Sequence, residues 1–376
     1  MDSEKKLDLI IRNTEEVLTE QDLKWMLETA IKLEHYVGFE ISGLIHLGTG
    51  LMNGKKIADF QKAGATARIF LADWHSWIND KLGGNREVIK NIAGAYFKEG
   101  MKISLEIMGG DQEKVKFVLG TDLYHNNDDY WATVIDVSKN ITLNRNLRSI
   151  DIMARKQEES IDFAKLIYPP MQVADIFAMG INLAHAGTDQ RKAHVIAREV
   201  AEKLKINPLA KEGERYKPVA IHHHLILGLQ KPPVWPIPKE SIREIWTSMK
   251  MSKSIPGSAV FIHDSPEEIR QKLQNAFCPE KETDFNPVLD WCKHLLFSRE
   301  KYSLRVERPP KFGGDITFWS FSDLEKSFRE GKLHPLDLKK AAAESIIKLL
   351  EPARKHFEKP RIKKMKEEIE RLKITR

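Results

Sequence analysis

The first 260 residues alternate between short apolar runs and longer stretches whose apolar residues recur with helical spacing. A near-continuous apolar run is expected for a strand of a parallel sheet that is covered on both faces. The pattern predicts these elements: a helix over 20–33, a strand over 36–40, a turn over 42–50, a helix over 51–64, and strands over 68–73, 102–108 and 219–229. This alternation is typical of a Rossmann-type, doubly wound α/β domain with a parallel sheet.

The other segments have helical patterns. Residues 112–157 are predicted to form a mostly helical insertion between the two halves of the sheet. At 265–268, Ser-Pro-Glu-Glu matches a helix N-cap, a proline at the first helical position and a capping-box glutamate. The helical pattern continues to the end, with loops over 278–285 and 306–318. We therefore expect a domain boundary near residue 260, between an α/β domain over 1–260 and an α-helical domain over 261–376.

Composition narrows the class of protein. A chain of 376 residues is too long for one typical core, so two domains are expected. No apolar run reaches the roughly 18 residues of a membrane span, and the N-terminal segment lacks the apolar region of a secretory signal. Cys278 and Cys292 are the only cysteines, which favours a reducing cytoplasm over a disulfide scaffold.

The charge of the chain gives a weaker indication of its partners. The net charge of +6 is too small to establish a nucleic-acid partner. Residues 355–376 are rich in Lys and Arg, which suits an RNA-facing surface and equally a solvated helix with Glu–Lys pairs. Abundant Lys, Glu and Ile with few Cys is also typical of thermophilic proteins.

Two strings about two hundred residues apart carry candidate chemistry: HLGTG at His46–Gly50 and KMSKS at Lys250–Ser254. Backbone N–H groups at a glycine-rich turn that opens a helix attract anions. Lysine ammoniums neutralise the charge that develops on a transferring phosphoryl group. Each string alone is a weak signal, but in this order the pair predicts a site for ATP.

Five further strings make the pattern specific: YVGFEISGLIHLG, FLADWHSWIN, YPPMQVADI, GTDQRKAH, and KFGGD with HPLDLK. From about residue 8 to about residue 356 the chain resembles the class I aminoacyl-tRNA synthetases, and among them the tyrosyl-tRNA synthetases of the archaeal and eukaryotic type. The resemblance implies that L-tyrosine is activated with ATP, accompanied by Mg²⁺, and then transferred to the 3′ end of tRNA(Tyr). It also implies a homodimer with the insertion at its interface, and an anticodon-binding helical domain.

The spacing of Tyr168, Gln172 and Asp175 at i, i+4 and i+7 puts the three on one face of a helix. The prolines at 169–170 suit the first turn of that helix. By itself such a face is more often a solvent-facing stripe than the wall of a pocket.

The resemblance favours the pocket. It implies that Tyr36 and Asp175 bind the phenol of the substrate, and that Tyr168, Gln172 and Gln190 hold its α-amino group. A site built to bond a hydroxyl leaves buried polar groups unpaired when phenylalanine enters. Such a site needs no separate editing domain.

For ATP, the resemblance assigns the phosphates to His46, Gly48 and the helix that follows. Thr49 occupies the position of the second histidine in the common HxGH form, so a hydroxyl that donates one hydrogen bond replaces a chargeable ring. Gly187 and Asp189 match positions near the ribose, although Asp189 could equally be a helix N-cap.

Lys250 and Lys253 are expected to act on the transition state more than on ground-state binding. The substrate carboxylate is already a nucleophile at neutral pH, so positioning and charge stabilisation supply the rate without a general base. Mg²⁺ should be held by phosphates and water more than by protein ligands, so no protein metal site is predicted.

For tRNA, Phe312, His334 and Asp337 match positions that engage the first anticodon base, where rings can stack and a carboxylate can accept from guanine. Each has a simpler alternative, since Phe312 could be a core residue and the segment from His334 could cap a helix. Arg148 and Arg191 resemble positions near the first acceptor base pair, where phosphate contacts would serve equally well.

Other histidines receive structural interpretations. His222–His224 fall in a predicted strand, where neighbours point to opposite faces, so they make a poor shared metal site. His75 either lines the tyrosine pocket or is structural.

Three rival functions share part of this sequence pattern. The tryptophanyl enzyme of the same subclass has nearly the same core, but an indole has no hydroxyl for Tyr36 and Asp175. A small-molecule nucleotidylyltransferase would not need the long helical tail. A catalytically silent paralogue used for RNA binding or signalling is disfavoured by the intact KMSKS, although Thr49 keeps it open.

Overall fold

The computed structural model describes residues 1–150, 162–238, 240, 242–253, 255 and 257–372. Its main sheet has the order β1-β8-β5-β2-β3-β4, in which β1 is antiparallel to β8 and the other neighbours are parallel. The strands are β1 (Glu16–Leu18), β2 (Glu34–Phe39), β3 (Thr66–Leu71), β4 (Val115–Leu119), β5 (Leu183–Gly187) and β8 (Val219–His223). The parallel strands run 3-2-1-4-5 in chain order, the doubly wound topology. The expected α/β fold class is confirmed.

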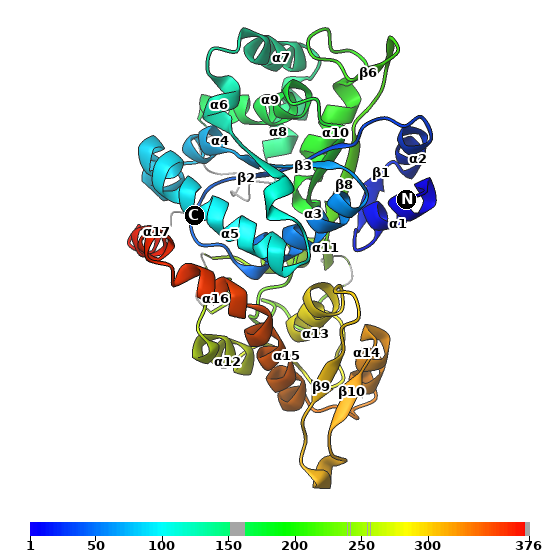
Figure 1. Cartoon of the computed structure of the whole chain (residues 1–376), viewed down its shortest axis with the longest axis vertical. Coiled ribbons are helices and arrows are strands. Elements are labelled where there is room, and N and C mark those ends of the chain that lie inside the picture. The colour runs from blue at the N-terminus through cyan, green and yellow to red at the C-terminus, as the bar shows by residue number, and fades with distance from the viewer. Residues whose placement is uncertain (151–161, 239, 241, 254, 256, 373–376) are drawn as a thin grey trace.

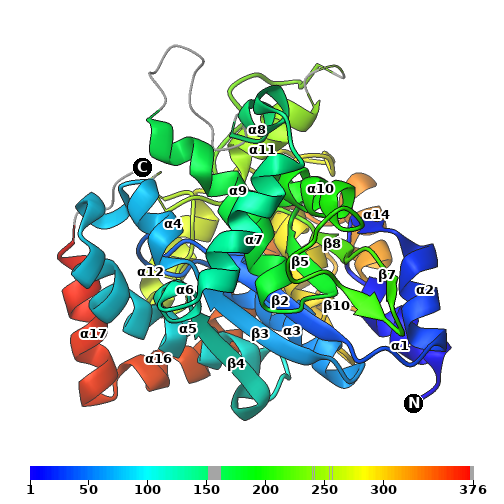
Figure 2. The same ribbon diagram turned by 90° about the horizontal axis from the view of Figure 1, so that it is seen from above.

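Helices cover both faces of this sheet (Figures 1 and 2). On β2, Tyr36 and Val37 point to opposite faces and belong to two separate apolar clusters. Val37 packs in the cluster that contains α3 (Asn53–Lys62) and α5 (Gly94–Ile107), and Tyr36 in the one that contains α9 (Phe163–Ala178) and α10 (Arg191–Val200). The other helices of this part are α1 (Ser3–Ile11), α2 (Glu20–Glu28), α4 (Asp73–Ile78), α6 (Gly120–Tyr124), α7 (Asp128–Lys139), α8 (Leu143–Ile150) and α11 (Ile242–Met249). A small hairpin pairs β6 (Ala210–Lys211) with β7 (Glu214–Arg215).

The C-terminal part is mainly helical and projects away from the sheet (Figure 1). It contains α12 (Pro266–Gln274), α13 (Pro287–Trp291), α14 (Phe321–Arg329), α15 (Pro335–Leu349), α16 (Glu351–Phe357) and α17 (Pro360–Glu370). The expected capping box begins α12, since Ser265 Oγ accepts from the Glu268 amide at 3.2 Å and Glu268 Oε2 accepts from the Ser265 amide at 2.8 Å. The last two helices, α16 and α17, return to pack on α5.

The segment around residue 260 is well packed. The Leu47 amide donates to the carbonyl of Val260 at 3.0 Å, and the Ile262 amide donates to that of Ile45 at 3.1 Å. These residues and Trp291 of α13 belong to one apolar cluster. A shared core on both sides of residue 260 leaves the division into two domains a prediction.

The strand predicted over 102–108 is wrong, because those residues form the end of α5. In this helix Met101, Ile103 and Leu105 are all buried, and a short apolar run of this kind does not distinguish a buried helix from a strand. The edge strand is instead β4, within the first part of the predicted insertion. Helices α6, α7 and α8 follow it, and residues 151–157 of that insertion lie outside the described part of the chain.

Other boundaries also differ from the sequence pattern. The helix predicted to reach residue 33 ends at Glu28, close to Ala30 with its left-handed φ of 54°. The strand predicted over 219–229 ends at His223. The expected loop over 306–318 contains part of a hairpin of β9 (Leu304–Val306) and β10 (Ile316–Phe318), strands too short to give a visible alternation.

Helix α9 begins at Phe163, so Pro169 and Pro170 lie inside it and not in its first turn. A proline in a helix has no N–H for the carbonyl four residues before it. For Pro170 that carbonyl belongs to Leu166, and it accepts from Asn146 Nδ2 of α8 at 2.7 Å. A side chain of a neighbouring helix thus replaces the missing backbone donor.

Candidate active site

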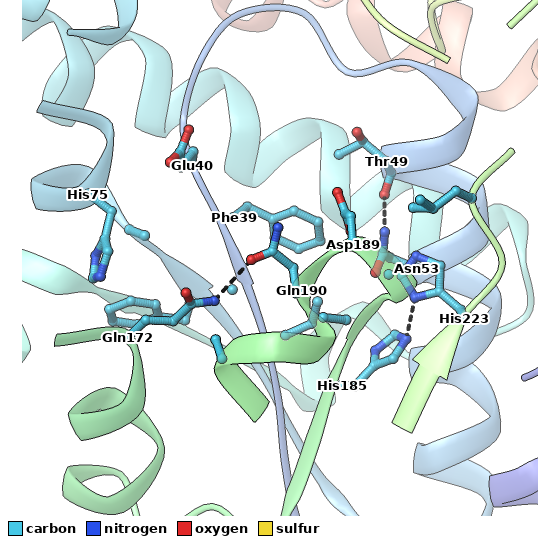
Figure 3. Close-up of a pocket in the computed structure, with 18 of the residues that line it drawn as sticks. Phe39, Glu40, Thr49, Asn53, His75, Gln172, His185, Asp189, Gln190 and His223 are labelled. Atoms are coloured by element: carbon cyan, nitrogen blue, oxygen red, sulfur yellow. Dashed lines mark hydrogen bonds between the residues drawn. The ribbon is translucent and has the colours of Figure 1, made fainter. Parts of the chain in front are cut away.

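A cavity of about 1000 Å³ opens at the carboxyl edge of the sheet, beside the ends of β2 and β5. The strand order reverses between these two strands, which is where open α/β sheets bind ligands. Every residue predicted to bind tyrosine or ATP, with the exception of Lys253, lines this cavity: Tyr36, His46, Gly48, Thr49, Tyr168, Gln172, Asp175, Gly187, Asp189, Gln190 and Lys250. Figure 3 shows several of them converging from separate elements.

Asp175 lies buried on α9 at one end of the cavity. Its Oδ1 accepts two hydrogen bonds, from Tyr124 Oη at 2.9 Å and from Tyr130 Oη at 3.1 Å. Burial raises the pKa of Asp175 to about 8, and the two phenol donors oppose that rise. The second oxygen, Oδ2, lies 3.7 Å from His75 Nε2 and has no hydrogen bond within the described residues.

Tyr36 is buried on β2 and lines the same end of the cavity as Asp175. Burial, and then the nearby charge of Asp175, raise the pKa of its phenol, so Tyr36 is a neutral hydrogen-bonding group. His75 is buried as well, and burial lowers its pKa to about 3. Near pH 7 this end of the cavity therefore presents a phenol, a carboxyl group that is mostly protonated, and a neutral imidazole.

Tyr168, Gln172 and Gln190 lie along the middle of the cavity. Tyr168 Oη donates to Glu40 Oε1 at 2.8 Å, and Gln172 Nε2 donates to Gln190 Oε1 at 3.1 Å (Figure 3). Glu40 also accepts from Asn79 Nδ2 at 2.5 Å. Carbonyl and carboxylate oxygens are acceptors, so the arrangement suits a cationic amino group.

The HLGTG turn brings His46 and Thr49 into contact. The Thr49 amide donates to His46 Nδ1 at 3.2 Å, so the ring proton is on Nε2, which lies 3.2 Å from Thr49 Oγ1. Burial, and then the charges of Lys253 and Lys250, lower the pKa of His46 to about 3. If Nε2–H donates to Thr49 Oγ1, the hydroxyl proton of Thr49 remains available to a ligand.

The two lysines of KMSKS have different partners. Lys250 Nζ lies 2.6 Å from Asp189 Oδ2, and Lys253 Nζ donates to Ser42 Oγ. Burial lowers the pKa of Lys253 to about 7, and the positive charge of Lys81 acts in the same direction. Ser254, the last residue of the string, lies outside the described residues.

Gly187 is the last residue of β5, and Asp189 follows the strand at the cavity edge. A Cβ on Gly187 would lie 2.7 Å from Leu225 Cδ2 and 2.8 Å from Asp189 Oδ1, so a side chain here would displace its neighbours. The Asp189 carboxylate does not cap a helix, because α10 has Gln190 at its N-cap without a side-chain bond. The N-cap alternative for Asp189 is therefore wrong.

Sequence reasoning missed Glu40, Tyr124 and Tyr130. Glu40 ends the apolar run of β2 and could have been noticed as a charge at a strand terminus. The two tyrosines are in the helical insertion, where nothing in the pattern indicates that they reach Asp175, about fifty residues away in the chain.

The residues proposed for tRNA lie outside this cavity. Phe312 ends a short 3₁₀ turn in the β9–β10 loop and is 60% exposed. His334 is the N-cap of α15 and accepts from the Leu336 amide at 3.2 Å, with Asp337 in the first turn, so the capping alternative is confirmed for His334. Arg148 is exposed on α8, whereas Arg191 Nε lies 2.8 and 2.9 Å from the two carboxylate oxygens of Glu16.

The histidines at 222–224 have separate partners. His222 Nδ1 lies 2.9 Å from Glu16 Oε2, and His223 Nδ1 lies 2.8 Å from His185 Nε2. His224 contacts Glu15 and Asp290 and stacks on His294 with centroids 3.9 Å apart. Glu15, His224 and His294 come close enough to hold a metal ion. The two rings are nearly parallel, at 11°, so their in-plane lone pairs do not converge.

A family model described as class I tRNA synthetases (W and Y) matches residues 28–351. A tyrosine–tRNA ligase of Thermococcus sibiricus is 63% identical over 361 residues, 96% of each chain. One of Pyrobaculum aerophilum is 48% identical over 378 residues, the full length of both. A crystal structure of tyrosyl-tRNA synthetase complexed with L-tyrosine from Pyrococcus horikoshii has a TM-score of 0.95 at 61% identity, covering 98% of this chain and 100% of that one.

Proposed function

Because the chain belongs to the class I tRNA synthetases of the tryptophan and tyrosine family and acts as a tyrosine–tRNA ligase, we propose a role for each group in its cavity. The enzyme forms tyrosyl-adenylate and diphosphate from L-tyrosine and ATP, and then transfers tyrosine to the 3′ end of tRNA(Tyr).

Selection of tyrosine rests on Asp175. Two phenols occupy its Oδ1, while Oδ2 has no hydrogen bond within the described residues. A substrate phenol that hydrogen-bonds Oδ2 and contacts Tyr36 would complete the hydrogen bonds of this end. Phenylalanine and tryptophan bring no hydroxyl and would leave a buried carboxyl oxygen unpaired. Tyrosine-specific enzymes are a known case of this effect, at about 10⁵-fold against phenylalanine.

The acceptors in the middle of the cavity would hold the α-ammonium group of tyrosine. Gln172 and Gln190 supply amide oxygens, and the Tyr168–Glu40 pair sets the charge beside them. With the phenol at one end and the ammonium in the middle, the substrate carboxylate would face the HLGTG turn. This places the nucleophile where the α-phosphorus of ATP must lie.

ATP would take the other end of the cavity. His46, Thr49 and the amides after Gly48 would face the phosphates, and Asp189 would accept from the ribose hydroxyls. Lys250 would have to exchange its bond with Asp189 for a phosphate oxygen when ATP enters. Burial lowers the pKa of Lys253. The negative charge of the ATP phosphates would favour its protonated, charged form.

Mg²⁺ would enter as part of the MgATP substrate. The carboxylates described in the cavity are already engaged, with Asp189 on Lys250, Glu40 on Tyr168 and Asp175 on two phenols. This favours a metal ion held by phosphates and water.

We assign tRNA contacts to the C-terminal part and to α8. The exposed ring of Phe312 and the exposed imidazole of His334 suit stacking on an unpaired base, and Asp337 suits acceptance from guanine. Arg148 is free to meet a phosphate, whereas Arg191 would first have to leave Glu16. We also propose a cytoplasmic location, which is supported by this function and by two cysteines that are both free and buried.

The decisive experiment is tyrosine-dependent pyrophosphate exchange with the Asp175→Ala variant. Loss of the carboxylate should reduce exchange by at least about 10³-fold, because the phenol loses its acceptor and two buried phenols lose theirs. Tyrosine, tryptophan and phenylalanine should be compared with the wild type. Undiminished exchange in the variant, or exchange by the wild type with tryptophan in place of tyrosine, would contradict the assignment.

A further inference from the structure

Three buried histidines on adjacent strands form a continuous hydrogen-bonded row below the cavity. His35 Nε2 of β2 lies 3.3 Å from His185 Nδ1 of β5, and His185 Nε2 lies 2.8 Å from His223 Nδ1 of β8. Strands β2, β5 and β8 are neighbours in the sheet. His185 is paired with Val37 and His223 with Gly187, so the row crosses the sheet diagonally and advances two residues toward the carboxyl ends at each strand. Figure 3 shows its last bond, between His185 and His223.

All three rings are neutral near pH 7. Burial lowers the pKa of His35 to about 3 and that of His223 to about 4, and it lowers the pKa of His185 far below its ordinary value. A neutral imidazole carries one N–H donor and one acceptor nitrogen. In an unbroken row, the nitrogen that carries the proton in one ring therefore determines which nitrogen is protonated in every other ring.

The surroundings of His35 determine the tautomers of the row. The Nδ1 atom of His35 is buried without a hydrogen-bond partner among the described residues, and the positive charges of Lys56 and Arg68 act on the ring. An orphaned buried N–H is rarer in proteins than an under-satisfied acceptor, and a positive surrounding favours a lone pair at that position. The proton is therefore on Nε2 of His35, which donates to His185, and His185 Nε2 donates to His223 Nδ1.

His223 is left with its own proton on Nε2. Its Nδ1 is used as the acceptor, and Nε2 faces the cavity, whose lining includes His223. This nitrogen is 3.6 Å from the point where a Cβ on Gly187 would stand, beside Asp189 at the end proposed for the nucleoside. The row thus presents one fixed N–H donor to that end of the cavity.

We propose that His223 is a nucleotide-binding residue that donates from Nε2 to an acceptor atom of the adenosine part of ATP, and that His185 and His35 are positioning residues that impose its tautomer. The inference rests on the proposed binding of ATP in this cavity. A fixed donor strengthens the binding of a ligand that has an acceptor at that place. It therefore adds to nucleotide affinity without changing the recognition of tyrosine.

Steady-state pyrophosphate exchange tests the donor. His223→Ala should raise the KM for ATP about three- to tenfold, the range of one lost hydrogen bond, with the KM for tyrosine unchanged. His223→Gln, whose amide N–H can reach the position of Nε2, should recover most of the loss. His263→Ala is the matched control, because it removes a buried histidine that bonds Tyr96 outside the cavity. An unchanged KM for ATP in a folded His223→Ala enzyme overturns the proposal.

The tautomer is tested in the wild-type enzyme, so this arm does not depend on a variant that folds. In a long-range ¹H–¹⁵N spectrum of histidine-labelled protein, His223 should show a protonated Nε2 and an unprotonated Nδ1, with assignment from the His223→Gln spectrum. The opposite tautomer would overturn the assigned direction. A His35→Phe variant should release this preference and raise the KM for ATP, whereas a purely structural role of His35 would alter stability alone.

Different results would contradict the proposed function and the inference about His223. Absence of tyrosine- and ATP-dependent exchange in the wild type would contradict the proposed function. Wild-type exchange together with ATP kinetics that ignore His223 would contradict only this inference.

Discussion

At the scale of single residues, the cavity contains buried groups whose pKa values differ from the ordinary values of their side chains. Burial raises the pKa of Asp175 and lowers the pKa of Lys253, so each charge is costly until a ligand or neighbour compensates it. In the roles proposed above, the substrate phenol would pair with Asp175 and the ATP phosphates would pair with Lys253.

Lys253→Ala should lower the rate of adenylate formation by about 10²-fold, because it removes charge stabilisation that develops in the transition state. The KM for tyrosine should change by less than about twofold. Single-turnover measurements of adenylate formation check this, with the exposed Lys116→Ala as control. A raised KM with an unchanged rate would indicate a binding role instead.

Asp175→Asn should stabilise the protein in a pH-dependent way. The folded pKa of about 8 exceeds the ordinary 3.8, so between these values the folded state holds a proton that the unfolded state has lost. In the wild type, the contribution of Asp175 to the free energy of unfolding is fully present below about pH 4 and is lost as the pH rises through 8. The variant lacks this loss, so its Tm gain should be small at pH 4.5 and reach about 5 °C at pH 8.5. Calorimetry at both pH values checks this, and the exposed Asp284→Asn should show no such trend.

At the scale of elements, α9 carries the binding face in spite of two internal prolines. Proline costs a helix interior about 3 kcal/mol, partly through the unpaired carbonyl. The bond from Asn146 to Leu166 removes part of that cost and joins α8 to α9. The position of Tyr168, Gln172 and Asp175 thus depends on a contact between helices as well as on local helix formation.

Asn146→Ala should lower the free energy of unfolding by about 1–3 kcal/mol, because it leaves a buried carbonyl without a donor. Denaturant unfolding measures the change, and the exposed Asn144→Ala of the same helix should be close to neutral. Equal stabilities of the two variants would show that water satisfies Leu166 equally well.

At the scale of the molecule, the insertion and the start of α9 expose large apolar side chains. Ile135 on α7, Leu143 on α8 and Phe163 on α9 are 61%, 63% and 75% exposed. These helices lie together at one end of the molecule, away from the C-terminal part (Figures 1 and 2). Exposed apolar side chains on neighbouring helices favour a protein interface, which supports the homodimer that the family resemblance implies.

The described helices include no candidate for a membrane span.

Ile135→Asp should weaken self-association by at least about tenfold, because it places a charge in a patch proposed to be buried. Sedimentation velocity over a dilution series measures the dissociation constant. Trp319→Asp, which changes a 75% exposed apolar residue of the C-terminal part, should leave the dissociation constant unaltered. A wild type that sediments as a monomer at all concentrations would contradict the dimer.

The sequence by itself determined the α/β fold class, the capping box before α12 and the family, because periodicity, caps and short motifs are encoded within a few neighbouring residues. It failed at residues 102–108, where a buried apolar run has no distinctive period. Only the tertiary structure decided that Tyr124 and Tyr130 reach Asp175, that Asn146 supports α9, and that His35, His185 and His223 form one row. These contacts join residues about twenty to one hundred and fifty positions apart, and packing, not local pattern, brings them together.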